Sequence, residues 1–119
     1  MAKCIIVDDS KFMRKIISDI LVNGGHIVCR LLLEKKNGID LYAKEKPDFL
    51  TMDITMGGKD GINAVREIKK KYPESRIIVI SALNENTIKM NDEKINADAF
   101  LTKPFTKEEL LSLVNKMLS

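Results

Sequence analysis

The sequence has no tryptophan, a single histidine and only two cysteines among its 119 residues. So few histidine and cysteine side chains argue against a zinc site. Six glycines and three prolines exclude collagen-like and low-complexity folds. No apolar run reaches the roughly 20 residues of a membrane-spanning helix, and the amino terminus does not read as a signal peptide. We therefore expect a cytoplasmic protein with no membrane insertion.

The charges nearly balance, with 20 Lys and Arg against 17 Asp and Glu and a net charge of +3. This excess is too small and too mixed to indicate direct nucleic-acid binding. Apolar residues make up 45% of the chain, which is enough for a buried core. The length fits one domain over residues 1–119. Cys4 and Cys29 lie in apolar surroundings, and we expect both to be buried free thiols.

Five short apolar runs alternate with helix-like stretches. They cover residues 3–7, 27–33, 49–52, 77–80 and 99–101. None alternates with polar residues, which is typical of parallel strands covered by helices on both faces. The order predicts an α/β fold, a doubly wound parallel sheet of five strands with right-handed crossovers.

Three of the intervening stretches have clear helical signals. Residues 61–71 follow Asp60, an expected N-cap, and the last helix opens with a capping box between Thr106 and Glu109. The stretch 10–22 places six apolar side chains on one predicted buried stripe: Phe12, Met13, Ile16, Ile17, Ile20 and Leu21.

Two helices have weaker signals. The second either begins late, near Asn37, or contains Gly38. The fourth, near residues 84–95, is rich in asparagine and poor in apolar positions, so its helix propensity is low.

Polar or ionisable residues follow four of the five predicted strands. They are Asp8 and Asp9 after the first, Asp53 after the third, Ser81 after the fourth, and Lys103 and Pro104 after the fifth. Ligands of open α/β sheets bind outside the carboxyl ends of the strands. We therefore expect these side chains to share one site.

Three neighbouring carboxylates repel one another and raise one another's pKa. A hard divalent cation such as Mg²⁺ relieves this repulsion, because it prefers oxygen ligands. Lys103 beside such a metal fits phosphoryl transfer, with one carboxylate free to attack. Taken singly, Asp8 and Asp9 fit a solvated turn and Ser81 fits a helix N-cap. We expect His26, which follows two glycines, to be a surface residue.

The segments that carry these residues resemble the receiver domains of two-component response regulators, of the stand-alone, CheY-like chemotaxis type. The likeness runs nearly end to end. The matching segments are IIVDDSKFMRKII near the start, KPDFLTMDITM around Asp53, DGI at 60–62, IIVISA ending at Ala82, and AFLTKPF at 99–105. The resemblance implies a flavodoxin-like (βα)5 fold with strand order 2-1-3-4-5.

The resemblance also implies how phosphorylation works. Asp53 is the phosphoacceptor and takes its phosphoryl group from a sensor histidine kinase. The implied Mg²⁺ ligands are Asp8, Asp9, Asp53 and the backbone carbonyl of Thr55. The site would hydrolyse its own acyl phosphate, so we expect a signalling protein that is not an enzyme for an external substrate.

The remaining implied roles concern the switch. Ser81 and Lys103 contact the phosphoryl oxygens, and a cis bond before Pro104 aims the lysine inward. When Ser81 moves, the ring of Phe100 fills the vacated space. This reshapes the face formed by the fourth helix, the fifth strand and the fifth helix, where a downstream motor or adaptor protein would bind.

Several positions depart from the family pattern. Gly57 stands where proline is common, and Gly58 adds further freedom to the loop beside Asp53. Glu34 and Lys35 fall where the family often has Asn-Gly. Phe100 replaces the commoner tyrosine. None of these changes removes a catalytic group.

Several functions are weighed. Because the chain ends after the last predicted helix, we expect a monomeric, free-standing switch, with chemotaxis favoured over a phosphorelay intermediate or a receiver fragment of a larger regulator. A small phosphatase of the haloacid-dehalogenase type would need a second aspartate two residues after its nucleophile, where Ser10 and Thr55 stand. A flavodoxin-like binding module would need a phosphate-cradling loop, and Asp8, Asp9 and Ser10 have the wrong charge for it.

Overall fold

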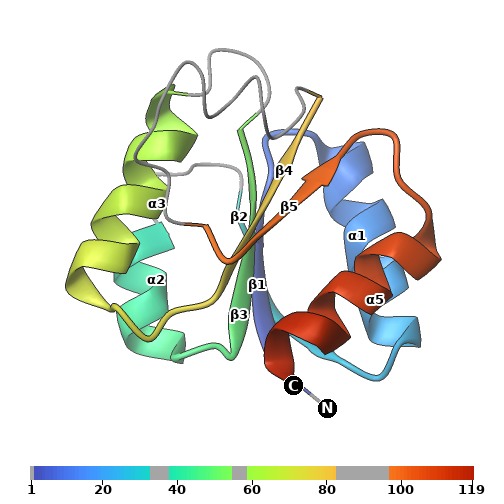
Figure 1. Ribbon diagram of the computed structural model, residues 1–119, viewed down its shortest axis with the longest axis horizontal. Helices are drawn as coiled ribbons and strands as arrows, with labels where there is room; N and C mark the ends of the chain where they lie inside the picture. The colour runs from blue at the N-terminus through green and yellow to red at the C-terminus, as the bar shows by residue number, and fades with distance from the viewer. Residues whose placement is uncertain (1, 33–37, 55–58, 83–96) are drawn as a thin grey trace.

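The computed structural model describes residues 2–32, 38–54, 59–82 and 97–119 as a sheet between two layers of helices (Figure 1). The elements in chain order are β1 (Lys3–Val7), α1 (Lys11–Asn23), β2 (Ile27–Leu32), α2 (Gly38–Glu45), β3 (Phe49–Asp53), α3 (Lys59–Lys71), β4 (Ile77–Ser81), β5 (Ala99–Thr102) and α5 (Lys107–Leu118). The predicted fourth helix, Leu33, Glu34 and Lys35 lie outside the described residues.

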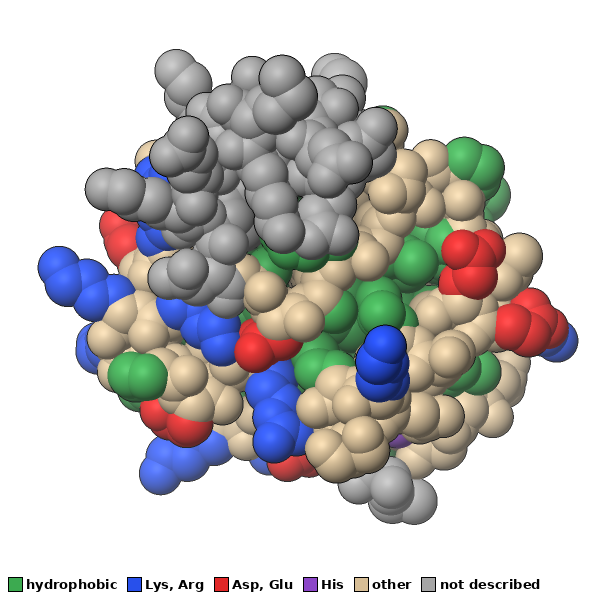
Figure 2. All heavy atoms as spheres, viewed as in Figure 1, with side chains coloured by type: hydrophobic (Ala, Val, Ile, Leu, Met, Phe, Trp, Pro, Cys, Tyr) green, Lys and Arg blue, Asp and Glu red, His purple; other side chains and the backbone are tan. Residues whose placement is uncertain are grey.

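The five strands form one parallel sheet in the order β2-β1-β3-β4-β5. This confirms the α/β class and the strand order that the resemblance implied. In Figure 1, α1 and α5 cover one face of the sheet, and α2 and α3 cover the other. None of the described helices has both the length and the apolar character needed to cross a membrane. Positive and negative side chains both appear on the face shown in Figure 2, as the small net charge suggests.

The strands are mostly apolar, and β3 and β4 at the centre of the sheet are buried on both faces. Alternate residues of β1 point into different core clusters: Ile5 packs on the α2–α3 side, and Ile6 packs on the α1–α5 side. All five residues of β3 and all five of β4 are buried. The continuous apolar runs in the sequence therefore reflect a sheet with a helical layer on each side.

Both cysteines are free thiols, as predicted. Burial raises the pKa of the Cys4 thiol to about 12, so this group stays protonated at neutral pH. Cys29 is only half-buried, and its thiol donates to the carbonyl oxygen of Cys4 at 3.0 Å. The strand register explains this contact: Cys4 pairs with Val28 and Ile5 with Arg30, so Cys29 is the extra residue of a bulge.

Two sequence expectations about helices were wrong. Phe12 is 72% exposed; at 3.6 residues per turn it lies about 140° around the helix from the buried Ile17. Asp60 is not an N-cap, because α3 already includes Lys59.

One other helix expectation holds. The capping box between Thr106 and Glu109 is formed in both directions. The described part of α2 begins at Gly38; residues 33–37, where the late start near Asn37 was predicted, lie outside the described residues. Beyond α1, Gly25 adopts a φ of 91°, a left-handed conformation that favours glycine.

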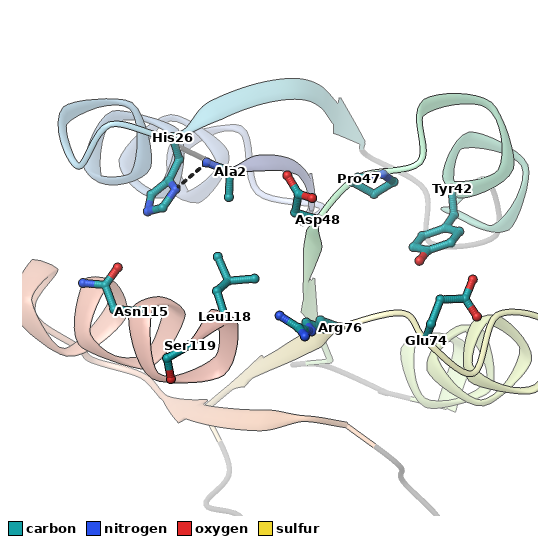
Figure 3. A pocket seen from close by; sticks show the side chains of 10 residues that line it. All are labelled: Ala2, His26, Tyr42, Pro47, Asp48, Glu74, Arg76, Asn115, Leu118 and Ser119. Atoms are coloured by element: carbon teal, nitrogen blue, oxygen red, sulfur yellow. Dashed lines mark hydrogen bonds between the residues drawn. The ribbon is translucent and has the colours of Figure 1, made fainter.

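His26 is half-buried at the edge of the sheet where the strands begin. Its Nδ1 accepts a hydrogen bond of 3.2 Å from the backbone N–H of Ala2 (Figure 3). Its ring packs edge-on against Phe49. Burial, and to a smaller extent the amino-terminal charge, lowers the pKa of His26 below its ordinary value. The imidazole is therefore held as the neutral acceptor that Ala2 requires.

This lowered pKa gives a pH-dependent stability. The unfolded chain binds a proton at His26 more readily, so the stabilisation is present above pH ~6.5 and is lost as the pH falls through the folded pKa. His26→Asn keeps an acceptor near the Nδ1 position and serves as the reference. When the pH falls from 7.5 to 5.5, the unfolding free energy of the wild type should fall by about 0.5–1 kcal/mol more than that of His26→Asn. Urea unfolding at both pH values measures this difference, and parallel losses in both proteins would contradict it.

Candidate functional site

Polar side chains from four strands meet where the strands end. Asp8 follows β1, Asp53 ends β3, Ser81 ends β4 and Lys103 follows β5. In the sheet register, Asp53 pairs with Ile80 and Ser81 pairs with Thr102. Because the strands are parallel, all four positions fall at one edge of the sheet.

Asp8, Asp9 and Asp53 form an acidic cluster. Each carboxylate offers one oxygen, and these oxygens lie within 4.8 Å of one another. Asp8 and Asp53 are buried, with 0% and 3% exposure, whereas Asp9 is exposed. Carboxylate oxygens are the donors that hard divalent cations prefer, and Asp8 Oδ2 is buried with no hydrogen-bond partner among the described residues. The donor set therefore fits a metal cation that reaches solvent on the Asp9 side.

Lys103 supplies the positive charge that faces this cluster. Its Nζ lies 3.4 Å from Asp53 Oδ1 and 3.8 Å from Asp8 Oδ2. Its backbone N–H donates to the carbonyl oxygen of Ser81 at 2.8 Å, and the peptide bond to Pro104 is cis, as expected. One ammonium group among three carboxylates leaves the cluster with an excess of negative charge.

Burial dominates the electrostatics of Asp8 and raises the pKa of its carboxyl group. The backbone N–H of Ser10 donates to Asp8 Oδ1 at 2.9 Å and acts in the opposite direction. The charge of Asp53 raises this pKa further, and Lys103 lowers it. The ionised form of Asp8 is therefore disfavoured by the fold itself.

The structure also places most of the other predicted site residues. Ser81 is buried at the end of β4. Phe100 lies on β5 and packs half-buried against the core cluster of the α2–α3 face, and Pro104 is exposed. Thr55, whose carbonyl is a predicted metal ligand, lies outside the described residues, as do Gly57 and Gly58.

Arg14 makes a hydrogen bond at this site that was not predicted from the sequence. Its guanidinium Nη1 donates to the backbone carbonyl oxygen of Asp8 at 2.7 Å. Arg14 lies one helical turn after Ser10, which caps α1 by accepting from the backbone N–H of Met13. The signal in the sequence was a cation in the first turn of the helix that follows the two aspartates.

A cavity of about 670 Å³ lies at the opposite edge of the sheet (Figure 3). Five of its lining residues precede strands: Ala2, His26, Pro47, Asp48 and Arg76. His26, which was expected at the surface, is half-buried and lies at the edge of the sheet opposite the acidic cluster, because Ala2 and Phe49 contact its ring.

The comparisons with known proteins agree with this geometry. Residues 4–115 match the family model of the response regulator receiver domain. The chain is 39% identical over 120 residues to the chemotaxis protein CheY of Bacillus subtilis, covering 98% of each protein. It is 36% identical over 115 residues to the chemotaxis protein CheY of Thermotoga maritima, covering 97% of this chain and 96% of that protein.

Among solved structures, the chain resembles one described as the CheX-CheY-BeF3-Mg+2 complex of Borrelia burgdorferi. The TM-score is 0.88 at 27% identity, over 98% of this chain and 89% of the other. The architecture is thus the flavodoxin-like fold of the receiver domains.

The buried charge of Asp8 is expected to lower the free energy of unfolding of the metal-free protein. The raised pKa means that the folded state loses stability as the pH rises above the unfolded pKa of Asp8, and the full penalty is present above the folded pKa. Asp8→Asn removes this charge and keeps the Oδ1 acceptor for Ser10. In metal-free protein at pH 7 it should raise the free energy of unfolding by about 1 kcal/mol or more.

Chemical denaturation in the presence of a chelator measures this effect. Asp9→Asn is the matched control, because Asp9 is an exposed member of the same cluster; its effect should be smaller. Destabilisation by Asp8→Asn would contradict the prediction.

Proposed function

The chain belongs to the response regulator receiver domains, and on this basis we propose that it takes up a phosphoryl group on Asp53 from the phosphohistidine of a sensor kinase. The observation that supports this most directly is the position of Asp53. Its carboxylate is buried at the end of β3, within 4.8 Å of the acidic oxygens of Asp8 and Asp9 and 3.4 Å from the ammonium group of Lys103.

The proposed reaction is an in-line displacement. An oxygen of the Asp53 carboxylate attacks phosphorus, the bond from phosphorus to the histidine nitrogen breaks, and the electron pair stays on the imidazole. Asp8, Asp9 and Asp53 would hold Mg²⁺, which when bound supplies positive charge to the phosphoryl oxygens. Lys103, whose ammonium group lies beside Asp53 and Asp8, would neutralise further charge on the phosphoryl oxygens. The carbonyl of Thr55 stays a predicted further ligand.

The acyl phosphate is hydrolysed at the same site. Water attacks phosphorus, the phosphoryl group leaves as inorganic phosphate, and the carboxylate of Asp53 is regenerated. Under this proposal the chain catalyses only its own phosphorylation and dephosphorylation. The phosphatase and the flavodoxin-like binding module weighed from the sequence are not favoured, since the receiver match covers residues 4–115.

The output would be a change in binding of a motor-associated or adaptor protein in chemotaxis, by a cytoplasmic monomer. The chemotaxis assignment is supported by the names of the relatives. In the proposed switch, Ser81 moves toward the phosphoryl group and the half-buried ring of Phe100 turns inward. The backbone N–H of Lys103 donates to the carbonyl oxygen of Ser81, and this hydrogen bond links the end of β4 to the segment after β5. Under the proposal, a shift at the phosphoryl group reaches β5 and α5 through this link.

Phosphorylation itself is tested with acetyl phosphate and Mg²⁺. Intact mass should show one added phosphoryl group on the wild type and none on Asp53→Asn or in excess chelator. Asp19→Asn, which removes an exposed carboxylate on α1, is the control and should be modified like the wild type. An unmodified wild type at saturating donor would rule out the proposed function.

The role of Lys103 is tested by separating metal binding from the switch. Lys103→Ala should leave Mg²⁺ affinity undiminished, because removing a cation strengthens the negative potential of the cluster. In the phosphorylated variant, changes in the NMR amide signals of β5 and α5 should be at least about halved. Lys107→Ala, an exposed lysine at the start of α5, is the control. A large loss of Mg²⁺ affinity in Lys103→Ala would contradict this role.

A further inference from the structure

Gly61 lies at the third position of α3, buried against the end of β3. A Cβ at this position would lie 2.7 Å from Ile54 Cγ2, 3.2 Å from the carbonyl oxygen of Asp53 and 3.4 Å from Ile54 Cα. Two of these three atoms are backbone atoms, which cannot rotate away as the end of a side chain can. The helix therefore approaches the Asp53–Ile54 segment at a distance that only glycine permits.

Backbone conformation does not account for this glycine. Its φ lies outside the left-handed region, unlike that of Gly25. Inside a helix, alanine is ordinarily preferred over glycine, because glycine loses more conformational freedom. The reason for a glycine at position 61 is thus the close approach to β3.

The segment that Gly61 touches has little freedom to move away. Ile54 is 4% exposed in the core cluster of the α2–α3 face. Its backbone N–H donates to the carbonyl oxygen of Ile80 at 3.0 Å, directly before Ser81. A side chain at position 61 would have to displace α3, Ile54 or the carbonyl group of Asp53. Each displacement acts next to the carboxylate that faces Lys103.

We propose that Gly61 is a positioning residue for Asp53. By carrying no side chain, it lets α3 hold the end of β3 where the Asp53 carboxylate lies 3.4 Å from Lys103 Nζ and joins the oxygens of Asp8 and Asp9. This inference rests on the proposed function, because it concerns the residue that would accept the phosphoryl group. Reactions that depend on such alignment lose about a hundredfold in rate for a misplacement of about 1 Å.

Gly61→Ala tests the proposal, with Gly24→Ala as the matched control. A Cβ at Gly24 would overlap Leu111 Cδ2, at the contact between α1 and α5 and away from the acidic cluster. Both variants thus introduce one methyl group into a tight contact, but only Gly61 borders Asp53. The rate of phosphorylation by acetyl phosphate, Mg²⁺ affinity by calorimetry and thermal stability are measured for the wild type and both variants.

Gly61→Ala is expected to slow phosphorylation at least tenfold and to weaken Mg²⁺ binding several-fold. Gly24→Ala should stay within twofold of the wild type in both measurements, even if its melting temperature falls as far as that of Gly61→Ala. A wild-type rate in Gly61→Ala would overturn the proposal, and so would an equal loss of rate in Gly24→Ala. Failure of the wild type to be phosphorylated would instead refute the proposed function, so the two failures are distinguishable.

A second pair of variants keeps the test decisive if Gly61→Ala does not fold. Ile54→Leu removes the Cγ2 methyl group, which is the closest atom to the added Cβ, and leaves the two backbone contacts. The double variant Ile54→Leu/Gly61→Ala should be phosphorylated three- to tenfold more slowly than Ile54→Leu alone. Equal rates in this pair would overturn the proposal.

Discussion

Repulsion among carboxylates at one edge of the sheet is the constraint on which the site depends. Asp8 and Asp53 are buried together at the ends of neighbouring strands, and Lys103 provides the nearest counter-charge. Folding alone disfavours this arrangement, as the raised pKa of Asp8 indicates. The apolar cores on both faces of the sheet supply the stability that tolerates it, so the molecule keeps a strained electrostatic site at its functional edge.

Backbone hydrogen bonds join the strand ends that carry the site. Ile54 N–H donates to Ile80 O, and Lys103 N–H donates to Ser81 O. These two bonds link the end of β3 to β4, and β4 to the segment after β5. The groups that would contact the phosphoryl group under the proposed function are therefore linked to one another through the main chain.

The sequence was informative where burial alone decides structure. Strands buried on both faces produce continuous apolar runs, and their parallel order brings Asp8, Asp53 and Lys103 together. It was less informative where geometry around a helix decides: Phe12 was placed on the buried stripe, although it lies on the far side of α1. The sequence places the cation of Arg14 in the first turn of α1, but its contact with the Asp8 carbonyl also depends on how α1 packs. The glycine at position 61 is visible in the sequence, but its meaning requires the distance to β3.

The division of the site along the chain has a consequence for damaged molecules. All three acids come from the first half of the sequence, whereas the amine and the hydroxyl come from the second. Neither half holds the complete set, so a proteolytic fragment that ends between β3 and β4 would carry the acidic cluster without Ser81 and Lys103. Under the proposed function, such a fragment would lack both groups that are expected to contact the phosphoryl oxygens.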